Sequence, residues 1–238
     1  MSMQTLRRVV SAVMLGSTLV GASAWASVDI GGVPIEEAAT VGGVPLLLDG
    51  AGYRKRGYFK IDVTALYTQT RVSSSDALEK VAGPRRLEIV VQQDITGSQA
   101  SRYFLIDFEA SATPAEFAQL INEVSLIGDV YSSLPKIKKG DIVTMDWIPG
   151  KGLLAMLNGN VLTPHGATSP YTNSELLSRV MFRMYTSGKT PAELHDNLFG
   201  VSYSMRDHPP APGTATATAA STTPAPSAAP AKPVASTH

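Results

Sequence analysis

The most regular alternation of apolar and polar residues lies between residues 58 and 68. One face of this segment carries Phe59, Ile61, Val63, Ala65 and Tyr67. The other face carries Tyr58, Lys60, Asp62, Thr64 and Thr68, with Leu66 among them. A period of two, with many β-branched and aromatic residues, predicts a half-buried strand. A similar alternation predicts a second strand over residues 85–95.

Helical signals fill the middle and the end of the folded part. Residues 113–116 form a capping box with Pro114 at the first helical position, which predicts the start of a helix. That helix carries an apolar stripe made of Phe117, Leu120, Ile121, Val124, Ile127 and Val130. Its spacing predicts that this face packs into the core. Further helices are expected at residues 98–110, 174–185 and 191–199, and a short one follows the N-cap signal at residues 73–76 and ends near Gly83.

Glycine-rich turns separate the remaining apolar runs. Short strands are predicted at residues 33–35 and 44–48, after which residues 50–52 are expected to break the pattern. A later meander has strands at residues 142–148 and 153–157, followed by an Asn158-Gly159 hairpin turn. Strands, paired helices, a meander and final helices predict a single-domain α+β fold, with helices packed on one face of an antiparallel sheet.

Both ends of the chain are predicted to lie outside this domain. Residues 1–26 combine two arginines, an apolar run over residues 9–20 and a small-x-small motif, which together are typical of a cleaved signal peptide. Residues 209–238 are almost entirely Ala, Thr, Pro and Ser, which predicts a disordered tail. The folded domain is therefore expected to span residues 27–208. The expected location is the periplasm or the exterior of a bacterial cell.

Composition narrows the classes of partner and chemistry. The chain has no cysteine, and it has 20 basic and 20 acidic residues. Without Arg7 and Arg8 of the leader, 18 basic residues stand against 20 acidic ones, a net charge of −2. This balance favours neither nucleic acid nor an anionic membrane as a partner, and no stable membrane insertion is expected after signal cleavage. The common nucleotide, hydrolase and zinc motifs are missing, so we expect no cofactor and no metal.

A basic cluster at residues 54–56 precedes the best strand and has two interpretations. It is either a solvated loop or a cluster from which Arg54 points into a cleft, where a guanidinium could hold a carboxylate or a phenolate. The polar face of the following strand has the same ambiguity. Water outside an antiparallel sheet is the simpler expectation for Lys60, Asp62 and Thr64, and a lined pocket is the alternative.

Several motifs in order resemble the chalcone isomerase-like family, in its bacterial exported branch. The first is Gly50-Ala51-Gly52-Tyr53-Arg54, followed by the strand from Phe59 to Tyr67. Arg86-Leu87-Glu88-Ile89, with Gln93-Asp94-Ile95 after it, resembles the end of a family strand. Lys138-Lys139-Gly140-Asp141, Pro149-Gly150-Lys151-Gly152 and Leu157-Asn158-Gly159 resemble later family motifs. The resemblance covers residues 44–200.

The resemblance implies a cleft between the sheet and the helices, and it assigns residues to that cleft. Arg54 matches the family arginine that holds the substrate's negative oxygen or a fatty-acid carboxylate. The family threonine falls at Asp62, whose carboxylate would repel a phenolate or pair with Arg54 or Lys60. The enzyme's Tyr and Asn would fall near Ala100 and Asp107 and are therefore lost.

Three hypotheses follow for the function. The first is a binding module for a small, apolar, anionic ligand of fatty-acid or phenolic type, with Arg54, Asp62 and Thr64 at the binding site. The second is a cofactor-independent intramolecular lyase of chalcone isomerase type, with Arg54, Tyr103 and Ser178 as catalytic candidates. The third is an envelope interaction protein without a ligand, in which Arg54 forms a salt bridge with Asp62. The sequence leaves the oligomeric state open.

Overall fold

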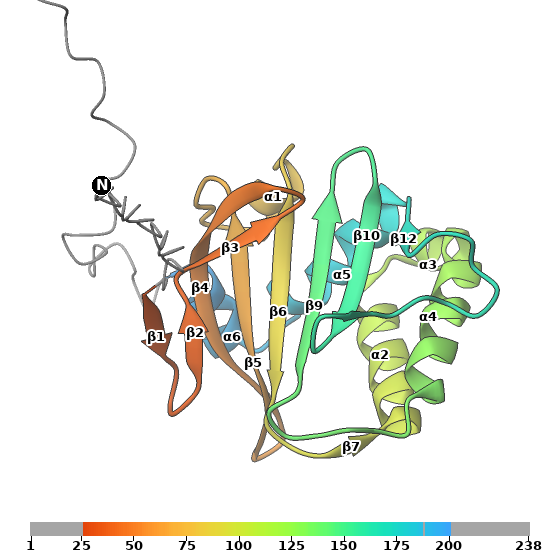
Figure 1. The fold of residues 1–238 in the computed structure, drawn as a ribbon, viewed down its shortest axis with the longest axis horizontal. Coiled ribbons are helices and arrows are strands. Elements are labelled where there is room, and N and C mark those ends of the chain that lie inside the picture. Colours follow the sequence, from red (N-terminus) through yellow and green to blue (C-terminus); the bar gives the residue numbers. More distant parts are fainter. Residues whose placement is uncertain (1–25, 188, 201–238) are drawn as a thin grey trace, which may run out of the picture.

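The computed structural model describes residues 26–187 and 189–200. The predicted leader, apart from Ala26, and the predicted tail lie outside these residues. The described part is built on one antiparallel sheet in the order β11–β10–β9–β6–β5–β4–β3, with β12 also paired to β10 (Figure 1). Its strands are β3 (Ala38–Val41), β4 (Val44–Arg56), β5 (Phe59–Thr68), β6 (Arg85–Val91), β9 (Ile142–Ile148), β10 (Gly152–Leu157), β11 (Asn160–Val161) and β12 (Tyr171–Thr172). Two small pairs accompany it, β1 (Ser27–Asp29) with β2 (Pro34–Glu36), and β7 (Ile95–Thr96) with β8 (Lys136–Ile137).

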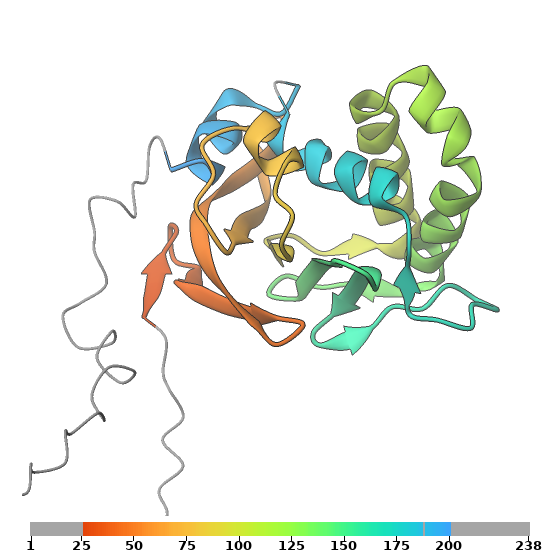
Figure 2. The ribbon, with the colours of Figure 1, turned by 90° about the horizontal axis from the view of Figure 1, so that it is seen from above.

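The helices form one layer against this curled sheet (Figure 2). They are α1 (Ser75–Glu79), α2 (Gly97–Ser111), α3 (Pro114–Gln119), α4 (Ile121–Ser133), α5 (Glu175–Thr186) and α6 (Ala192–Leu198). The side chains of Ser74, Thr113 and Ser174 each accept a hydrogen bond from a backbone N–H in the first turn of α1, α3 and α5. The α+β class with helices on one sheet face is therefore confirmed.

Two apolar clusters fill the two sides of the sheet. The larger cluster joins α1, α2 and α4–α6 to side chains such as Leu66 and Leu87. The second cluster lies on the other face, where β1 and β2 pack near Val63 and Tyr67. Because both faces of β5 are covered, the expectation that its polar face meets water is wrong: Asp62 and Thr64 are 3% and 0% exposed.

Strand β4 runs straight through the glycines that were expected to end it. Gly50 and Gly52 lie inside β4, and they face α6 at close range. A Cβ on Gly50 would lie 2.0 Å from the backbone oxygen of Asn197. These glycines therefore allow a helix to approach the sheet closely, which is the physical reason that the pattern lacks side chains there.

A bulge in β5 changes the face of one predicted residue. Arg54 pairs with Asp62 but Lys55 pairs with Lys60, so Ile61 is an extra residue on β5. The expected alignment of Lys60 with Asp62 is consequently wrong. The Lys60 ammonium instead lies 3.7 Å from the centre of the Tyr53 ring, on the side of the second cluster.

The predicted helix after Thr113 is interrupted at Leu120, which separates α3 from α4. Of its apolar stripe, Leu120 and Val124 are buried, whereas Ile121 is 47% exposed. The prediction that the whole stripe is core is therefore wrong. The break divides the segment into two helices, and α4 packs against α2, so only its inner side is buried.

Candidate functional site

A cavity of about 90 Å³ lies between the sheet and the helices, beside Arg54. Strands β4–β6 and β9 supply one side, and helices α2, α4 and α5 supply the other. Most of its lining is apolar: Ile61, Ile89, Val91, Ile95, Ala100, Phe104, Ile137, Val143, Met181 and Met184. The tyrosines Tyr103, Tyr131 and Tyr185 complete this wall. We call it the central cavity.

The charged residues of the central cavity are gathered at one end. Arg54 donates from Nε to Oδ2 of Asp62 at 2.8 Å, and its Nη2 lies 2.7 Å from the same oxygen. Its Nη1 donates to Oδ2 of Asp107 at 3.0 Å. Arg54 is therefore held between a strand carboxylate and a helix carboxylate, and its side chain is 18% exposed.

Aromatic rings and hydroxyls support this cluster. The guanidinium of Arg54 lies 4.7 Å from the centre of the Tyr185 ring, and Thr64 donates a hydrogen bond of 2.8 Å to the second oxygen of Asp62. Arg56 forms an ion pair with Asp107 and lies 4.3 Å from the centre of the Tyr103 ring. The result is a charge-balanced group of two arginines and two carboxylates.

Electrostatics keep the arginine charged and the neighbouring phenols neutral. Burial by itself lowers the pKa of Arg54, but the Asp62 carboxylate and further contributions from Tyr185 and Asp107 raise that pKa by more. Burial raises the pKa of Tyr185 and of Tyr131, although Arg54 opposes the rise. Both phenols therefore serve as neutral hydroxyl groups at ordinary pH.

A second hollow of about 210 Å³ opens outside the same cluster. It shares Arg54, Asp107 and Met184 with the central cavity. Its other lining residues are Lys55, Arg56, Ala110, Ser111, Lys189, Thr190 and Pro191. We call it the outer hollow. Four basic side chains and one carboxylate line it, and three of the four are ion-paired: Arg54 and Arg56 with Asp62 and Asp107, and Lys55 with Glu193.

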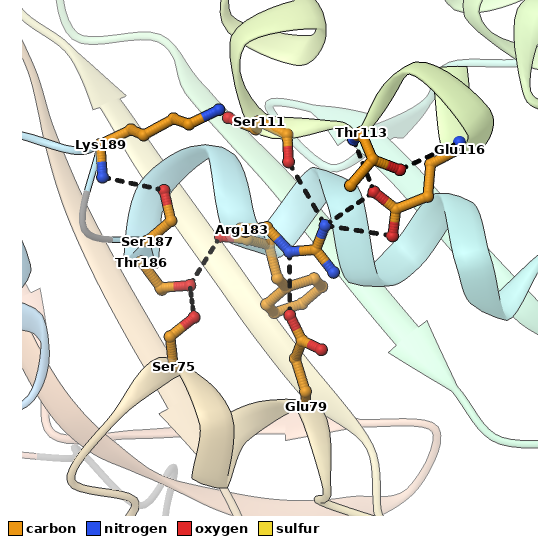
Figure 3. Close-up of polar contacts among 10 residues, drawn as sticks. Ser75, Glu79, Ser111, Thr113, Glu116, Arg183, Thr186, Ser187 and Lys189 are labelled. Atoms are coloured by element: carbon orange, nitrogen blue, oxygen red, sulfur yellow. Dashed lines mark hydrogen bonds and ion pairs between the residues drawn. The ribbon is translucent and has the colours of Figure 1, made fainter. Parts of the chain in front are cut away.

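An ion network holds the helices that border the outer hollow (Figure 3). Arg183 on α5 donates to Glu79 on α1 at 2.9 Å, to the backbone oxygen of Ser111 at 3.3 Å and to Glu116 on α3 at 3.0 Å. Lys189 donates to the backbone oxygen of Ala110. The end of α2 is therefore fixed against α5, which sets the distance between them at the hollow.

A third hollow, of about 40 Å³, lies at the other end of the central cavity. It shares Tyr131 and Met181 with that cavity, and residues of α4, β10, β12 and the segment between β11 and β12 complete its mostly apolar lining. We call it the side hollow. The sheet order places β4, β5, β6, β9 and β10 side by side, so the outer hollow, central cavity and side hollow follow one another across the sheet.

The structure brings some of the sequence-derived candidates together and separates others. Arg54, Asp62 and Tyr103 line the central cavity, whereas Thr64 and Ser178 are not among its lining residues. Thr64 instead donates a hydrogen bond to Asp62. Ser178 packs against Arg85, with 3.5 Å between the Oγ of Ser178 and the Nη2 of Arg85. The residue that sequence reasoning missed is Asp107, which it counted only as a lost asparagine.

No cluster of three or more His, Cys, Asp or Glu residues suited to a metal occurs within residues 26–187 and 189–200. The arrangement of the central cavity instead suits the binding of a small molecule. An apolar space with ionic groups at one end can enclose the apolar part of a molecule and hydrogen-bond its polar end.

Comparisons with known proteins identify the family and support the fold. A sequence model of a family described as chalcone isomerase-like matches residues 27–194. Among solved structures, the chain is similar to a fatty-acid binding protein from Arabidopsis thaliana, with a TM-score of 0.57 and 12% identity. That similarity covers 75% of this chain and 100% of the other, and at this identity it concerns the fold. A search of curated proteins finds no match.

Proposed function

This chain belongs to the chalcone isomerase-like family, and we propose that it is a non-catalytic binding module for a small, largely apolar molecule with an anionic end. One observation carries the proposal. The central cavity is apolar except at one end, where Arg54 lies between Asp62 and Asp107. A molecule with an acyl or aromatic body and a single acidic group has the same division into an apolar and a polar part.

The anionic end of the ligand belongs at the border between the central cavity and the outer hollow. Asp107 interacts with both Arg54 and Arg56. A ligand carboxylate can therefore replace Asp107 at Nη1 of Arg54 while Asp107 keeps its pair with Arg56. Lys189, which lines the outer hollow and donates to a backbone oxygen, supplies a positive charge near the one that the ligand adds.

The size of the cavity restricts what binds without rearrangement. Pockets for drug-sized ligands occupy roughly 300–1,000 Å³, and the central cavity is about 90 Å³. The partitions toward the two hollows contain Met184 and Met181. Methionine is unbranched and adapts its shape readily, so rotation of these two side chains can join the three spaces around a longer ligand.

The two other hypotheses have weaker support. Of the three catalytic candidates for intramolecular cyclisation, Arg54 and Tyr103 line the central cavity. The third catalytic candidate, Ser178, contacts Arg85 instead of the cavity. A ligand-free interaction protein predicts the bridge between Arg54 and Asp62, which is present, but it gives no reason for an apolar cavity beside that bridge.

Export to the periplasm or the exterior is part of the proposal. It rests on the basic start, the apolar run and the small-x-small motif of residues 1–26. Expression of the complete chain in a bacterial host, with the mass of the protein from the periplasmic fraction, tests it. A product that begins at Ser27 supports export, and a protein that remains in the cytoplasm with residues 1–26 attached contradicts it.

The binding proposal is tested with defined probes. Octanoate, dodecanoate, hexadecanoate and the matching alcohols are added to purified protein, and the melting temperature is recorded; an organic extract of the protein is analysed by mass spectrometry. A ligand at 100 times its Kd should stabilise the fold by about 2.7 kcal/mol. Carboxylates should stabilise it more than alcohols of equal length.

Two matched variants show whether the cavity is the binding site. Ala100→Leu places a larger side chain in the lining of the central cavity and should abolish the shift. Ala118→Leu makes the same change on the exposed surface of α3 and should retain the shift. The binding proposal fails if no probe stabilises the wild type and the extract contains no ligand, or if both variants respond equally.

A further inference from the structure

The β4–β5 hairpin ends in two exposed aromatic residues. Gly57 takes the positive φ of 58° that the turn requires, and Tyr58 and Phe59 follow it. The side chains of Tyr58 and Phe59 are 101% and 65% exposed, so neither ring is covered by the rest of the described chain. Adjacent exposed rings at the tip of a projecting hairpin are typical of a contact surface.

Basic residues surround this tip on the same end of the sheet. The hairpin itself contributes the exposed Lys60, whereas its Lys55 and Arg56 are paired with Glu193 and Asp107. The loop before β9 contributes Lys138 and Lys139, and the backbone ties it to the hairpin: Gly140 donates to Val91 on β6, and Gln92 donates to Ile61 on β5. Figure 1 shows the β4–β5 turn and the segment between β8 and β9 along the lower edge of the sheet.

The acidic residues beside Lys138 and Lys139 are Asp94 and Asp141, and both are carboxylates that offset part of the positive charge. Asp141 accepts hydrogen bonds from the backbone N–H of Lys138 and from Asn158. Asp94 accepts from the backbone N–H of Lys139 and pairs with Lys136. Because Lys136 balances Asp94, the exposed residues Lys60, Lys138 and Lys139 outnumber the remaining carboxylate, Asp141, and leave a positive surface beside the aromatic tip.

We propose that this end of the sheet docks on an anionic phospholipid surface, with Tyr58 and Phe59 at the headgroup level and the lysines over the lipid charges. Aromatic rings favour the membrane–water interface, and each Lys or Arg near an anionic surface strengthens attachment. The docking is peripheral, since no helix among the described residues is long and apolar enough to span a bilayer. The near-zero net charge does not oppose it, because attachment depends on the local charge, and Lys60, Lys138 and Lys139 lie together at this end.

Lipid docking is independent of ligand binding in the central cavity, but it has a geometric consequence for it. Lys55 and Arg56 belong both to the hairpin and to the lining of the outer hollow. A membrane contact at the tip would therefore bring the outer hollow close to the lipid surface. An acidic protein surface is the competing occupant, and it would not require the two aromatic rings to enter a hydrocarbon layer.

Sedimentation with vesicles tests the proposal. The complete chain and its variants are expressed, and mass spectrometry confirms that all purified proteins begin at the same residue. Their binding is then compared on vesicles of phosphatidylcholine alone and of phosphatidylcholine mixed with phosphatidylglycerol. Wild type should bind the anionic vesicles and lose binding in high salt. Tyr58→Ser with Phe59→Ser should weaken binding about 10-fold, and Lys138→Gln with Lys139→Gln should weaken it about 20-fold.

Matched controls lie away from the tip. Lys80→Gln with Lys151→Gln removes the same charge from the opposite end of the sheet, and Ile121→Ser with Leu126→Ser removes exposed apolar residues from α4. Both should bind like wild type. The proposal is overturned if wild type does not prefer anionic vesicles, which leaves an acidic protein as the occupant, or if the controls lose as much binding as the tip variants. It is also overturned if loss of the aromatic residues has no effect, because attachment would then depend on charge alone.

Discussion

Two ion pairs join neighbouring strands of the same sheet, yet they lie on opposite faces and in different surroundings. Arg86 on β6 holds Asp146 on β9 with two hydrogen bonds of 2.6 and 2.7 Å, on the face that carries Tyr67. Arg54 on β4 holds Asp62 on β5 on the face that carries the helices. Both aspartates have side chains that are only 4% exposed.

The difference lies in what surrounds each guanidinium. Arg86 binds both oxygens of one carboxylate, so one guanidinium and one carboxylate neutralise each other in a bidentate pair, which we call the closed pair. Arg54 binds one oxygen of Asp62, shares Asp107 with Arg56 and lines two hollows. A buried arginine pair is therefore poor evidence for a site by itself. The adjacent space and the exchangeable second carboxylate distinguish a candidate site from a structural bridge.

The largest expected effect comes from breaking the closed pair. Arg86→Met leaves Asp146 buried without its partner, which should lower the free energy of unfolding by about 3–5 kcal/mol. Ligand-induced stabilisation should remain, because the substitution lies on the other face of the sheet. Urea denaturation with and without a bound probe measures both quantities.

The matched control replaces both members of that pair. Arg86→Met with Asp146→Leu removes both charges and should recover most of the lost stability, since apolar replacements of a buried pair are often neutral or better. If Arg86→Met costs less than about 1 kcal/mol, or abolishes ligand binding, the two ion pairs do not differ in the way that we propose.

Local patterns in the sequence predict much of the fold. The alternation over residues 58–68 gives β5, and the turn at Asn158-Gly159 gives the β10–β11 hairpin, in which both turn residues have positive φ. These features depend on neighbours in the chain. The predictions from the sequence are wrong where the local structure depends on contacts with segments that are distant in the chain. The continuation of β4 through Gly50 depends on the approach of α6, and the bulge at Ile61 depends on strand pairing.

The candidate site likewise has parts that the sequence predicts and parts that only the tertiary structure reveals. The sequence leaves a solvated loop and a cleft open for Arg54; the family resemblance implies the cleft and allows a pair with Asp62. Its contact with Asp107 joins residues 53 positions apart, and only the packing of α2 against the sheet places them together. The outer hollow likewise depends on Lys189 and the end of α2, so no local pattern could predict it.

A third ion cluster, in the helix layer, extends the comparison. Arg183→Met removes the contacts of Arg183 with Glu79 and Glu116 and should lower stability by about 2 kcal/mol at neutral pH. Burial by itself raises the pKa of Glu116, but the Thr113 backbone N–H and the Arg183 guanidinium lower it by more. A lowered folded-state pKa gives stability above the ordinary value of 4.5 that is lost as the pH falls through the lowered value.

The difference between wild type and Arg183→Met should therefore shrink in acid. Urea denaturation at neutral pH and at about pH 3 measures the change. Arg179→Met, on the same helix, is the control. The Nε atom of Arg179 is buried without a hydrogen-bond partner among the described residues, so we expect an effect within about 0.5 kcal/mol. A pH-independent loss in Arg183→Met would show that packing, not charge, dominates.

Asp107→Asn tests whether the second carboxylate competes with the ligand. The substitution removes a negative charge from Arg54 and Arg56 but keeps the shape of the side chain. Dodecanoate should bind about 10-fold more tightly, which corresponds to about 1.4 kcal/mol, whereas dodecanol should bind as before. Isothermal titration calorimetry measures both affinities. An equal change for acid and alcohol would place the ligand's polar end elsewhere.

The smallest expected effect concerns the far end of the cavity, where no charge takes part. Met181 and Tyr131 separate the central cavity from the side hollow. Met181→Ala should remove part of this partition and increase the affinity for hexadecanoate about 5-fold over that for octanoate, because only the longer chain reaches the side hollow. Ala155→Leu places a larger side chain in the lining of the side hollow and should have the opposite effect on hexadecanoate alone. If both variants change octanoate and hexadecanoate equally, the apolar part of the ligand ends within the central cavity, and Arg54 alone determines its position.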